Sequence, residues 1–374
     1  MISHIRPILT VALLGSLVFL GSCKSDSING GENNFDRAAM LSNYGNNTIL
    51  PAYLNLQDAT VSLETSADAF IEDPTESTLS ILQSDLKAAR LAWQEANIFQ
   101  FGPAESVTLR ASLNTYPADT SQIKSNIESG DYTLGTIENR AAVGFPALDF
   151  LLHGIGESNQ EIVSIYSEGE LAASFQAYLQ DNITFIKQKV DDTATEWSAD
   201  GGNYLATFLS EENAGTDVGS SLGMLINATV LHYERFFRDG KIGIPAGVRS
   251  AGVRRPVATE AHFGGYSLEL ALANLEAIQR LFKGAGIDGS QDVGLEENLE
   301  ALDAAELSTE INTEIDQAVT ALEELNDPLS GQIESDNEPV LNTFKELQDI
   351  VRLLKVDMTS VLGVTITYQD NDGD

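Results

Sequence analysis

Two side chains on one predicted helix have the types and spacing to share a proton or a metal ion. Asp149 and His153 are four residues apart, which places them on the same face of an α-helix. A carboxylate and an imidazole so placed can supply two ligands to iron or another divalent cation. Alternatively, His153 donates a hydrogen bond to Asp149 or to a backbone carbonyl near the helix end. Both hypotheses are compatible with the spacing.

Histidine is too scarce for the common zinc-hydrolase patterns. After His4 the chain has only His153, His232 and His262, which lie in three distant segments. None of them forms the HExxH pattern that places two imidazoles and a general base on one helix. The serine-hydrolase elbow, the P-loop and the dinucleotide-binding glycine pattern are also missing from the sequence. A carboxylate-rich iron or calcium site is compatible with the 56 acidic residues, but that abundance makes such clusters unspecific.

Positive charge is concentrated in one short segment. Of the 21 lysine and arginine residues, six fall between positions 235 and 255. The planar guanidinium of arginine binds carboxylates through two hydrogen bonds, both inside proteins and on ligands. The segment is therefore predicted to pair with acids in a domain interface or to receive an anionic ligand, and a solvated loop is the third alternative. The six residues are Arg235, Arg238, Lys241, Arg249, Arg254 and Arg255.

The composition excludes several classes of partner. The chain has 374 residues, of which 43% are hydrophobic, and a formal net charge of -35. A field of that sign repels phosphate backbones, so nucleic-acid binding is not expected. Cys23 is the sole cysteine, which excludes an internal disulfide and a thiolate metal cluster. The final residues 370–374 imitate the opening of a calcium loop but lack its closing glutamate, so a solvated acidic tail is predicted.

The first 23 residues predict that the protein is located in the cell envelope. The apolar stretch from Ile8 to Leu20 is shorter than the roughly 20 residues that a membrane-spanning helix needs, so residues 1–22 are predicted to be a signal peptide. The sequence LGSC that ends at Cys23 resembles a bacterial lipobox, whose cysteine is acylated. The alternative is an ordinary secretory signal with an incidental cysteine. We predict lipid anchoring at Cys23 in the outer membrane, on its periplasmic or surface face, followed by a flexible tether over 23–36.

Apolar residues recur at helical spacing along most of the chain. The stripes at 79–93, 311–325 and 340–358 step by three and four residues, as on the seams of antiparallel helix bundles. No strand pattern of useful length is present, so an all-α fold is predicted. Its halves, 37–200 and 201–374, are expected to be separate helical bundles. Further helices are predicted around 37–72, 168–196, 217–238 and 265–283, with functional loops at 102–135 and 239–265.

One of these predicted helices begins with a sequence that resembles a family signature. Residues 144–154 are GFPALDFLLHG, similar to the GxHxxE signature of imelysin-like proteins, which an apolar run and a glycine follow. The stretches RLAW at 90–93, NTYP at 114–117 and EAHFGGYS at 260–267 resemble other segments of that family in the same order. The resemblance covers residues 36 to 368 and implies two antiparallel four-helix-type bundles packed around a central cleft.

The departure from the signature affects the expected chemistry. Where imelysin-like proteins have His and Glu, this chain has Pro146 and Asp149. Proline cannot coordinate a metal, although it suits the first turn of a helix. The family is named for a proposed metallopeptidase activity, and the missing imidazole argues against that activity here. The resemblance assigns cleft or ligand-binding positions to Phe145, Pro146, Asp149, Glu260 and Ser267, with Trp93, Asn114 and Arg140 as secondary positions.

The resemblance also implies a function. Imelysin-like proteins are linked to iron uptake and resemble the periplasmic component of a ferrous-iron import system. Our leading hypothesis is therefore a non-catalytic lipoprotein that binds iron or an iron-containing ligand and acts with an envelope uptake partner. One alternative is a metal-dependent peptidase that uses Asp149, His153 and Glu260. The other is a scaffold at the outer membrane that docks a partner through the arginine-rich segment.

Overall fold

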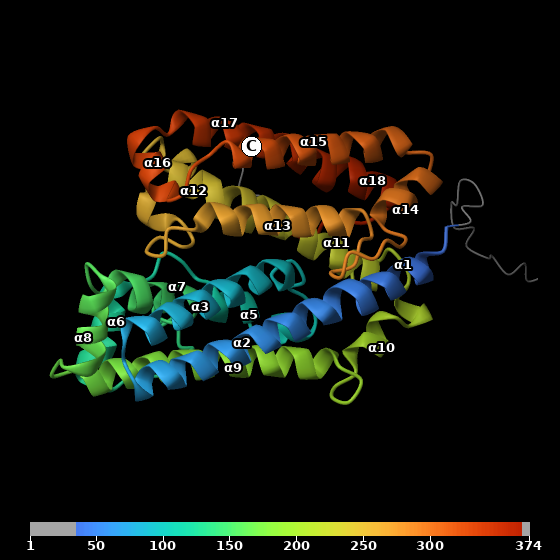
Figure 1. Ribbon diagram of the computed structural model, residues 1–374. Helices are drawn as coiled ribbons and strands as arrows, with labels where there is room; N and C mark the ends of the chain where they lie inside the picture. Colours follow the sequence, from blue (N-terminus) through green and yellow to red (C-terminus); the bar gives the residue numbers. More distant parts are fainter. Residues whose placement is uncertain (1–34, 369–374) are drawn as a thin grey trace, which may run out of the picture. The chain divides into compact units, whose positions relative to one another are not determined.

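All regular elements in residues 35–368, which the computed structural model describes, are helices (Figure 1). An isolated bridge between Ala285 and Gln291 is the one strand-like pairing in this range. The prediction of an all-α fold is confirmed. None of the described helices is long and apolar enough to cross a bilayer. The predicted signal peptide, Cys23, most of the predicted tether and the acidic tail lie outside the described residues.

The first group of helices is built on α2 (Leu50–Glu72), α3 (Glu76–Ala96) and α9 (Ala172–Trp197). Helix α2 packs against both α3 and α9. A capping box at Thr75 begins α3, because its side chain satisfies a backbone N–H that the first helical turn leaves without a partner. The apolar stripe predicted on α3 is buried from Leu79 to Trp93, so hydrophobic burial holds this helix in place.

The second group consists of α11 (Ser221–Leu231), η4 (His232–Gly243), α13 (Ser267–Phe282), α15 (Ala305–Glu323) and α17 (Glu338–Arg352). Helix α15 packs against α13 and α17, and α17 packs against η4. The stripes predicted on α15 and α17 face this core.

Shorter elements connect and cover the two groups. The remaining α-helices are α1 (Arg37–Asn43), α4 (Pro103–Ser106), α5 (Leu109–Leu113), α6 (Thr120–Ser129), α7 (Phe145–Asp149), α8 (Asn159–Ser167), α10 (Tyr204–Phe208), α12 (Ile244–Ala246), α14 (Leu295–Ala301), α16 (Leu329–Ser335) and α18 (Thr359–Leu362). The π-helical turns are η1 (Tyr44–Ile49), η2 (Phe150–Gly154) and η7 (Leu353–Met358), and the 3-10 turns are η3 (Glu211–Asn213), η5 (Val248–Ser250) and η6 (Pro256–Ala258).

Two features join the helix groups. Helices α3 and α13 pack against each other. In addition, the first described helix is bound to the second group, because Asn43 Nδ2 donates to the carbonyl of Gly284 at 2.7 Å and the Tyr44 hydroxyl donates to that of Leu281 at 2.9 Å. The division into two four-helix bundles near residue 200 stays a prediction.

Both predicted loops contain more helix than the sequence suggested. Residues 102–135 include the ten-residue helix α6, and η4 extends through the glycine-rich segment to Gly243. A side chain at Gly243 would place its Cβ 2.6 Å from the ring of Phe344. This glycine therefore permits close packing of η4 on α17, whereas the sequence alone favoured its interpretation as a loop signal.

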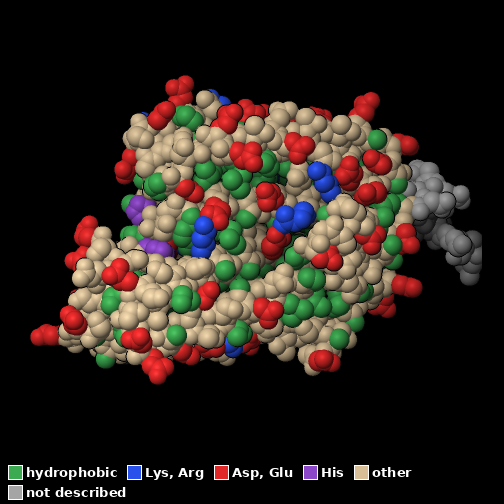
Figure 2. Space-filling model, viewed as in Figure 1, with side chains coloured by type: hydrophobic (Ala, Val, Ile, Leu, Met, Phe, Trp, Pro, Cys, Tyr) green, Lys and Arg blue, Asp and Glu red, His purple; other side chains and the backbone are tan. Residues whose placement is uncertain are grey.

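The described surface is strongly acidic. On the face shown in Figure 2, Asp and Glu side chains are scattered over both helix groups, and basic side chains are found mainly in the band between them. This distribution agrees with the excess of 56 acidic over 21 basic residues. Positive charge that gathers in one place on this protein therefore needs a structural or functional reason.

Candidate functional site

The signature helix α7 begins at a glycine that no other residue could replace without strain. Gly144 has a φ of 87°, and a Cβ at this position would lie 2.4 Å from the carbonyl oxygen of Leu113. Pro146 occupies the first turn of α7, where the missing N–H costs no hydrogen bond. The α-helix ends at Asp149 and continues as the π-helical turn η2.

Asp149 is buried and fully engaged. Its carboxylate lies 3.1 Å from the guanidinium of Arg90, and the two side chains are 1% and 0% exposed. It also accepts the backbone N–H groups of Phe263 at 2.9 Å and Gly264 at 3.1 Å. The carboxylate therefore fixes the segment before α13 to α7 through two charge-assisted hydrogen bonds, and it connects α3 to both through the ion pair with Arg90.

Glu260 is the second buried carboxylate of the site. It forms an ion pair with Lys241 and accepts the amide N–H groups of Asn114 at 2.8 Å and Gln94 at 3.1 Å. Burial alone would raise the pKa of Glu260, but the positive charges of Lys241 and Arg90 outweigh it, so the pKa lies below its usual value. Glu260 is therefore an ionised acceptor, and both of its carboxylate oxygens already accept hydrogen bonds from buried donors.

The same buried network continues into the second helix group. Asn274 Nδ2 donates to the Gln94 carbonyl at 2.6 Å, and its Oδ1 lies 2.7 Å from His232 Nε2. The other nitrogen, His232 Nδ1, lies 3.1 Å from the Arg110 guanidinium. Burial lowers the pKa of His232 well below its usual value, and the charge of Arg110 lowers it further. We assign a neutral imidazole that donates from Nε2 and accepts at Nδ1.

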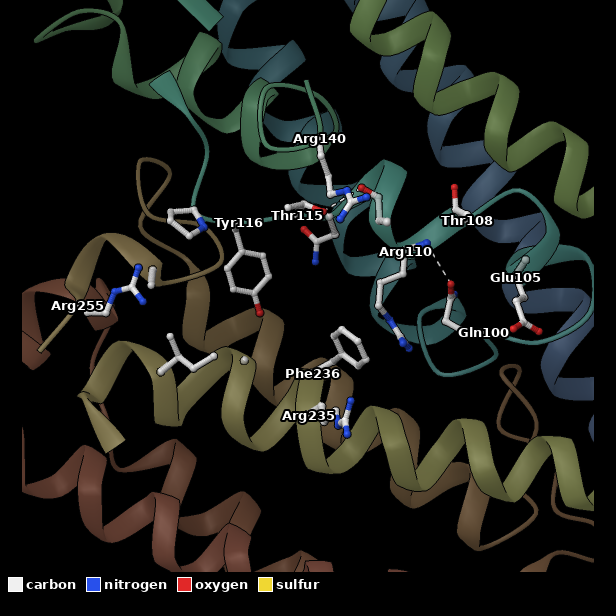
Figure 3. A pocket seen from close by; sticks show the side chains of 17 residues that line it. Gln100, Glu105, Thr108, Arg110, Thr115, Tyr116, Arg140, Arg235, Phe236 and Arg255 are labelled. Atoms are coloured by element: carbon white, nitrogen blue, oxygen red, sulfur yellow. Dashed lines mark hydrogen bonds between the residues drawn. The ribbon is translucent and has the colours of Figure 1, made fainter. Parts of the chain in front are cut away.

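Two neighbouring cavities lie on this network. The signature cavity has a volume of about 350 Å³ and is lined by Pro146, Asp149, Glu260 and His262, among others. The arginine cleft has a volume of about 740 Å³. Tyr116 and Pro117 line both cavities. The arginine cleft is defined by Arg110, Arg140, Arg235 and Arg255, with Tyr116 and Phe236 between them (Figure 3).

Comparisons with known proteins identify the family. The family model described as Imelysin matches residues 49–354. The chain belongs to the imelysin family. An imelysin-like protein from Psychrobacter arcticum shares its fold, with a TM-score of 0.68 at 16% identity over 89% of this chain and 97% of that one. A structure assigned as an iron-regulated protein A precursor from Parabacteroides distasonis gives a TM-score of 0.73 at 16% identity, over 90% and 97% of the two chains.

A curated relative matches over a short segment only. Iron-regulated protein A from Synechococcus elongatus is 26% identical over 76 residues, which are 20% of this chain and 21% of that protein. The match thus spans about a fifth of the relative's length.

The fold of this imelysin brings most of the predicted site residues together. Pro146, Asp149 and Glu260 line the signature cavity, while Asn114 and Arg140 line the arginine cleft. The other predicted positions support the local structure: Phe145 packs on Trp93 with ring centroids 6.4 Å apart, and the Ser267 hydroxyl accepts the N–H of Ala261 at 3.0 Å before α13.

His153 does not join Asp149. No hydrogen bond connects them, and the buried Nε2 of His153 has no partner among residues 35–368. The predicted hydrogen bond assumed α-helical spacing, but the π-helical turn η2 begins directly after Asp149 and changes the angle between the two side chains. Burial lowers the pKa of His153, so this imidazole is held in its neutral form.

The residues of the basic segment lie in two different environments: some pair with other groups of the protein, and others line the arginine cleft. Lys241 pairs with Glu260 inside the network, and Arg254 donates to the carbonyls of Ile333 at 3.2 Å and Glu334 at 3.0 Å. Arg235 and Arg255, by contrast, line the arginine cleft. Arg238 and Arg249 lie 3.1 Å and 2.9 Å from carboxylate oxygens of Asp239.

Three functional residues were missed in the sequence. Arg90, Gln94 and Arg110 hold the network together, yet only Arg90 lay in a stretch compared with the family. A usable signal existed, because Arg90 and Gln94 fall on the apolar stripe of α3 and are both 0% exposed. Polar residues at core positions indicate a buried network or a binding site.

The residues present do not fit a bare metal ion. Among residues 35–368, no group of three or more His, Cys, Asp or Glu side chains could hold one. The two carboxylates of the signature cavity are each paired with a buried cation, which competes directly with a divalent ion for the same oxygens. The predicted half-site of Asp149 and His153 therefore lacks a free carboxylate.

Proposed function

We propose that this imelysin is a non-catalytic binding protein of the bacterial envelope that takes up iron as a complex with another molecule. One observation carries the proposal: Asp149 and Glu260 already neutralise Arg90 and Lys241 inside the protein. Neither carboxylate has the free oxygens that a metal ion or an activated water would need. A cargo iron would therefore arrive with its own ligands, and the protein would recognise those ligands.

The family supports the iron part of this proposal. Two of the similar proteins carry the name iron-regulated protein A. The lipobox-like LGSC at Cys23 supports anchoring in the envelope, where an uptake partner could receive the cargo. Peptidase chemistry is disfavoured by the engaged carboxylates, and a docking role for the basic segment is disfavoured by the internal pairing of Arg254.

Calorimetric titration of the full chain tests the proposal. The probes are ferric citrate and haem as complexes, and ferrous, zinc and calcium ions as bare cations. We expect at least one iron complex to bind with micromolar affinity or better, and no bare ion to bind more tightly than millimolar. The proposal fails if neither complex binds, if a bare ion binds tightly and Asp149→Asn abolishes that binding, or if the protein cleaves a protein substrate in a chelator-sensitive manner.

A further inference from the structure

We infer that the arginine cleft is a binding site for a small organic anion that carries two or more carboxylate groups. The inference rests on the proposed function for the role of the ligand in iron transport, and it adds the chemical class of that ligand. The binding site itself follows from the charge, the hydrogen bonding and the shape of the cleft.

The charge of the cleft is opposite to that of the protein. Four arginines line it, and Glu105 is the single acidic residue in the lining. The whole chain has 56 acidic and 21 basic residues, so a cavity lined by four arginines and one acidic residue is a strong departure from its surroundings. A concave, positively lined cavity concentrates the field and raises the local concentration of anions.

Two of these arginines are available to a ligand. The guanidinium groups of Arg140 and Arg255 form no hydrogen bond or ion pair with any residue in 35–368, and both residues are exposed. They differ in this from Arg90, which is buried against Asp149. An exposed guanidinium retains its planar fork of donors for a carboxylate.

Arg110 supplies a cation that is fixed in position. Its Nε donates to Asn97 Oδ1 at 2.8 Å, and its carbon Cζ lies 3.9 Å from the ring centroid of Phe236. It forms no ion pair with a carboxylate in the described part of the chain, and its histidine partner His232 is neutral. Its charge therefore remains uncompensated at the cleft wall, in an orientation set before any ligand binds.

Two buried amide atoms in the lining also lack partners. Gln100 Oε1 accepts the N–H of Arg110 at 3.0 Å, while its Nε2 has no partner among the described residues. Asn114 Nδ2 donates to Glu260, which leaves its Oδ1 buried and without a partner in the same range. A ligand carboxylate would satisfy the Gln100 donor, and a ligand hydroxyl would satisfy the Asn114 acceptor.

The arrangement favours an organic polycarboxylate over a compact inorganic ion. The four arginines come from different segments and lie on different sides of Tyr116 (Figure 3). Between them the walls are apolar or aromatic, with Phe236 and Ile244. A single phosphate could reach one side of such a cavity, whereas a carbon skeleton with several carboxylates can contact the walls and more than one arginine.

Titration of the full chain with iron-free citrate, tricarballylate and trimesate tests the inference. Inorganic phosphate and the neutral triethyl citrate are the comparison ligands. At least one tricarboxylate should bind, with an affinity that falls as salt is raised, and triethyl citrate should not bind. Arg140→Gln and Arg255→Gln should each weaken binding by roughly tenfold, the usual effect of a lost charge-assisted contact.

Arg352→Gln is the matched control. Arg352 is 61% exposed, pairs with Glu310 and lies outside both cavities, so its substitution makes the same change in net charge. It should leave the affinity within about twofold, as expected for an exposed and screened ion pair. Thermal melting of each variant shows whether the fold is retained, which we expect because Arg140 and Arg255 are exposed.

The outcomes separate this inference from the proposed function. The inference is overturned if none of the three tricarboxylates binds more tightly than millimolar, if both cleft variants bind them as the unaltered chain does, or if phosphate alone binds. An iron complex that binds equally well to the cleft variants would support the proposed function and reject the cleft. Tricarboxylate binding that is lost in the variants but gains nothing from added iron would support the cleft and reject the role in iron uptake.

Discussion

The carboxylate of Asp149 lies 3.1 Å from the guanidinium of Arg90, and both side chains are buried. By the resemblance to the family signature, Asp149 stands where that signature has its glutamate and Pro146 stands where it has its histidine. Asp149 thus has a structural role, because it connects α3 to the segment before α13. The signature cavity lies beside this ion pair, but the carboxylate of Asp149 that lines it is paired with a cation of the protein itself.

Removing the charge of Asp149 should destabilise the fold strongly. Asp149→Asn leaves Arg90 as a buried cation without a counter-charge, which typically costs about 3 kcal/mol or more. Urea unfolding measures the loss. Asp357→Asn is the control, because it breaks an ion pair with Arg352 in which both partners are partly exposed and should cost less than about 1 kcal/mol. Equal midpoints for the two variants would contradict a structural role for Asp149.

The pair of Lys241 and Glu260 should show strong energetic coupling. Lys241→Met alone leaves a buried carboxylate without its cation, and a loss of about 3 kcal/mol is expected. Adding Glu260→Gln removes the uncompensated charge and should restore much of that loss. A double-mutant cycle from unfolding free energies measures the coupling. Simple additivity of the two substitutions would show that the ion pair contributes little.

Stability should decrease in mildly acidic solution because of His232. Its folded pKa lies well below the ordinary value, so the unfolded chain binds a proton that the folded chain rejects. This contribution to stability is complete above about pH 6.5 and is lost as the pH falls, by up to about 1.4 kcal/mol per pH unit. Urea unfolding between about pH 7.5 and pH 5.5 should show the decrease. His232→Asn should make the decrease smaller, and the part that remains is expected from His153, whose pKa burial also lowers.

Gly243 should tolerate no side chain without a loss of stability. The Cβ of Gly243→Ala would lie 2.6 Å from the Phe344 ring, and such overpacking usually costs about 1–3 kcal/mol. The smaller side chain of Phe344→Leu, combined with Gly243→Ala, should recover part of the loss. Gly219→Ala is the control, because no atom lies within 4 Å of the added group. A melting temperature unchanged by Gly243→Ala would show that η4 can move away from α17.

The sequence predicted the helices whose apolar residues repeat with a regular period. The stripe from Leu79 to Trp93 and its counterparts on α15 and α17 are buried as expected. It missed α6, in which only Ile123 and Ile127 mark an apolar face, and it placed the glycines of η4 in a loop. Those glycines allow side chains from distant parts of the chain to pack closely against the helix. Such contacts cannot be predicted from the local sequence pattern.

The site was predictable only where single residues carried a family pattern. Pro146 and Asp149 could be located in this way, but the partner of Asp149 could not, since Arg90 lies 59 positions earlier in the chain. The π-helical turn η2 further changed the spacing on which the hypothesis for His153 depended. Nor did any sequence pattern unite Arg110 with Arg255, because their proximity to one cleft depends on the packing of both helix groups.

The hydrogen bonds of Tyr44 to the last turn of α13 and of Asn43 to the turn that follows restrict how the molecule can open. Residues 37–72 form one nearly continuous helical rod whose start is tied to the second group and whose length is packed in the first. This rod acts as a strap across the junction. A hinge motion that separates the two helix groups would have to break these hydrogen bonds. We therefore expect a ligand to enter through rearrangement of side chains at the rim of the cavities.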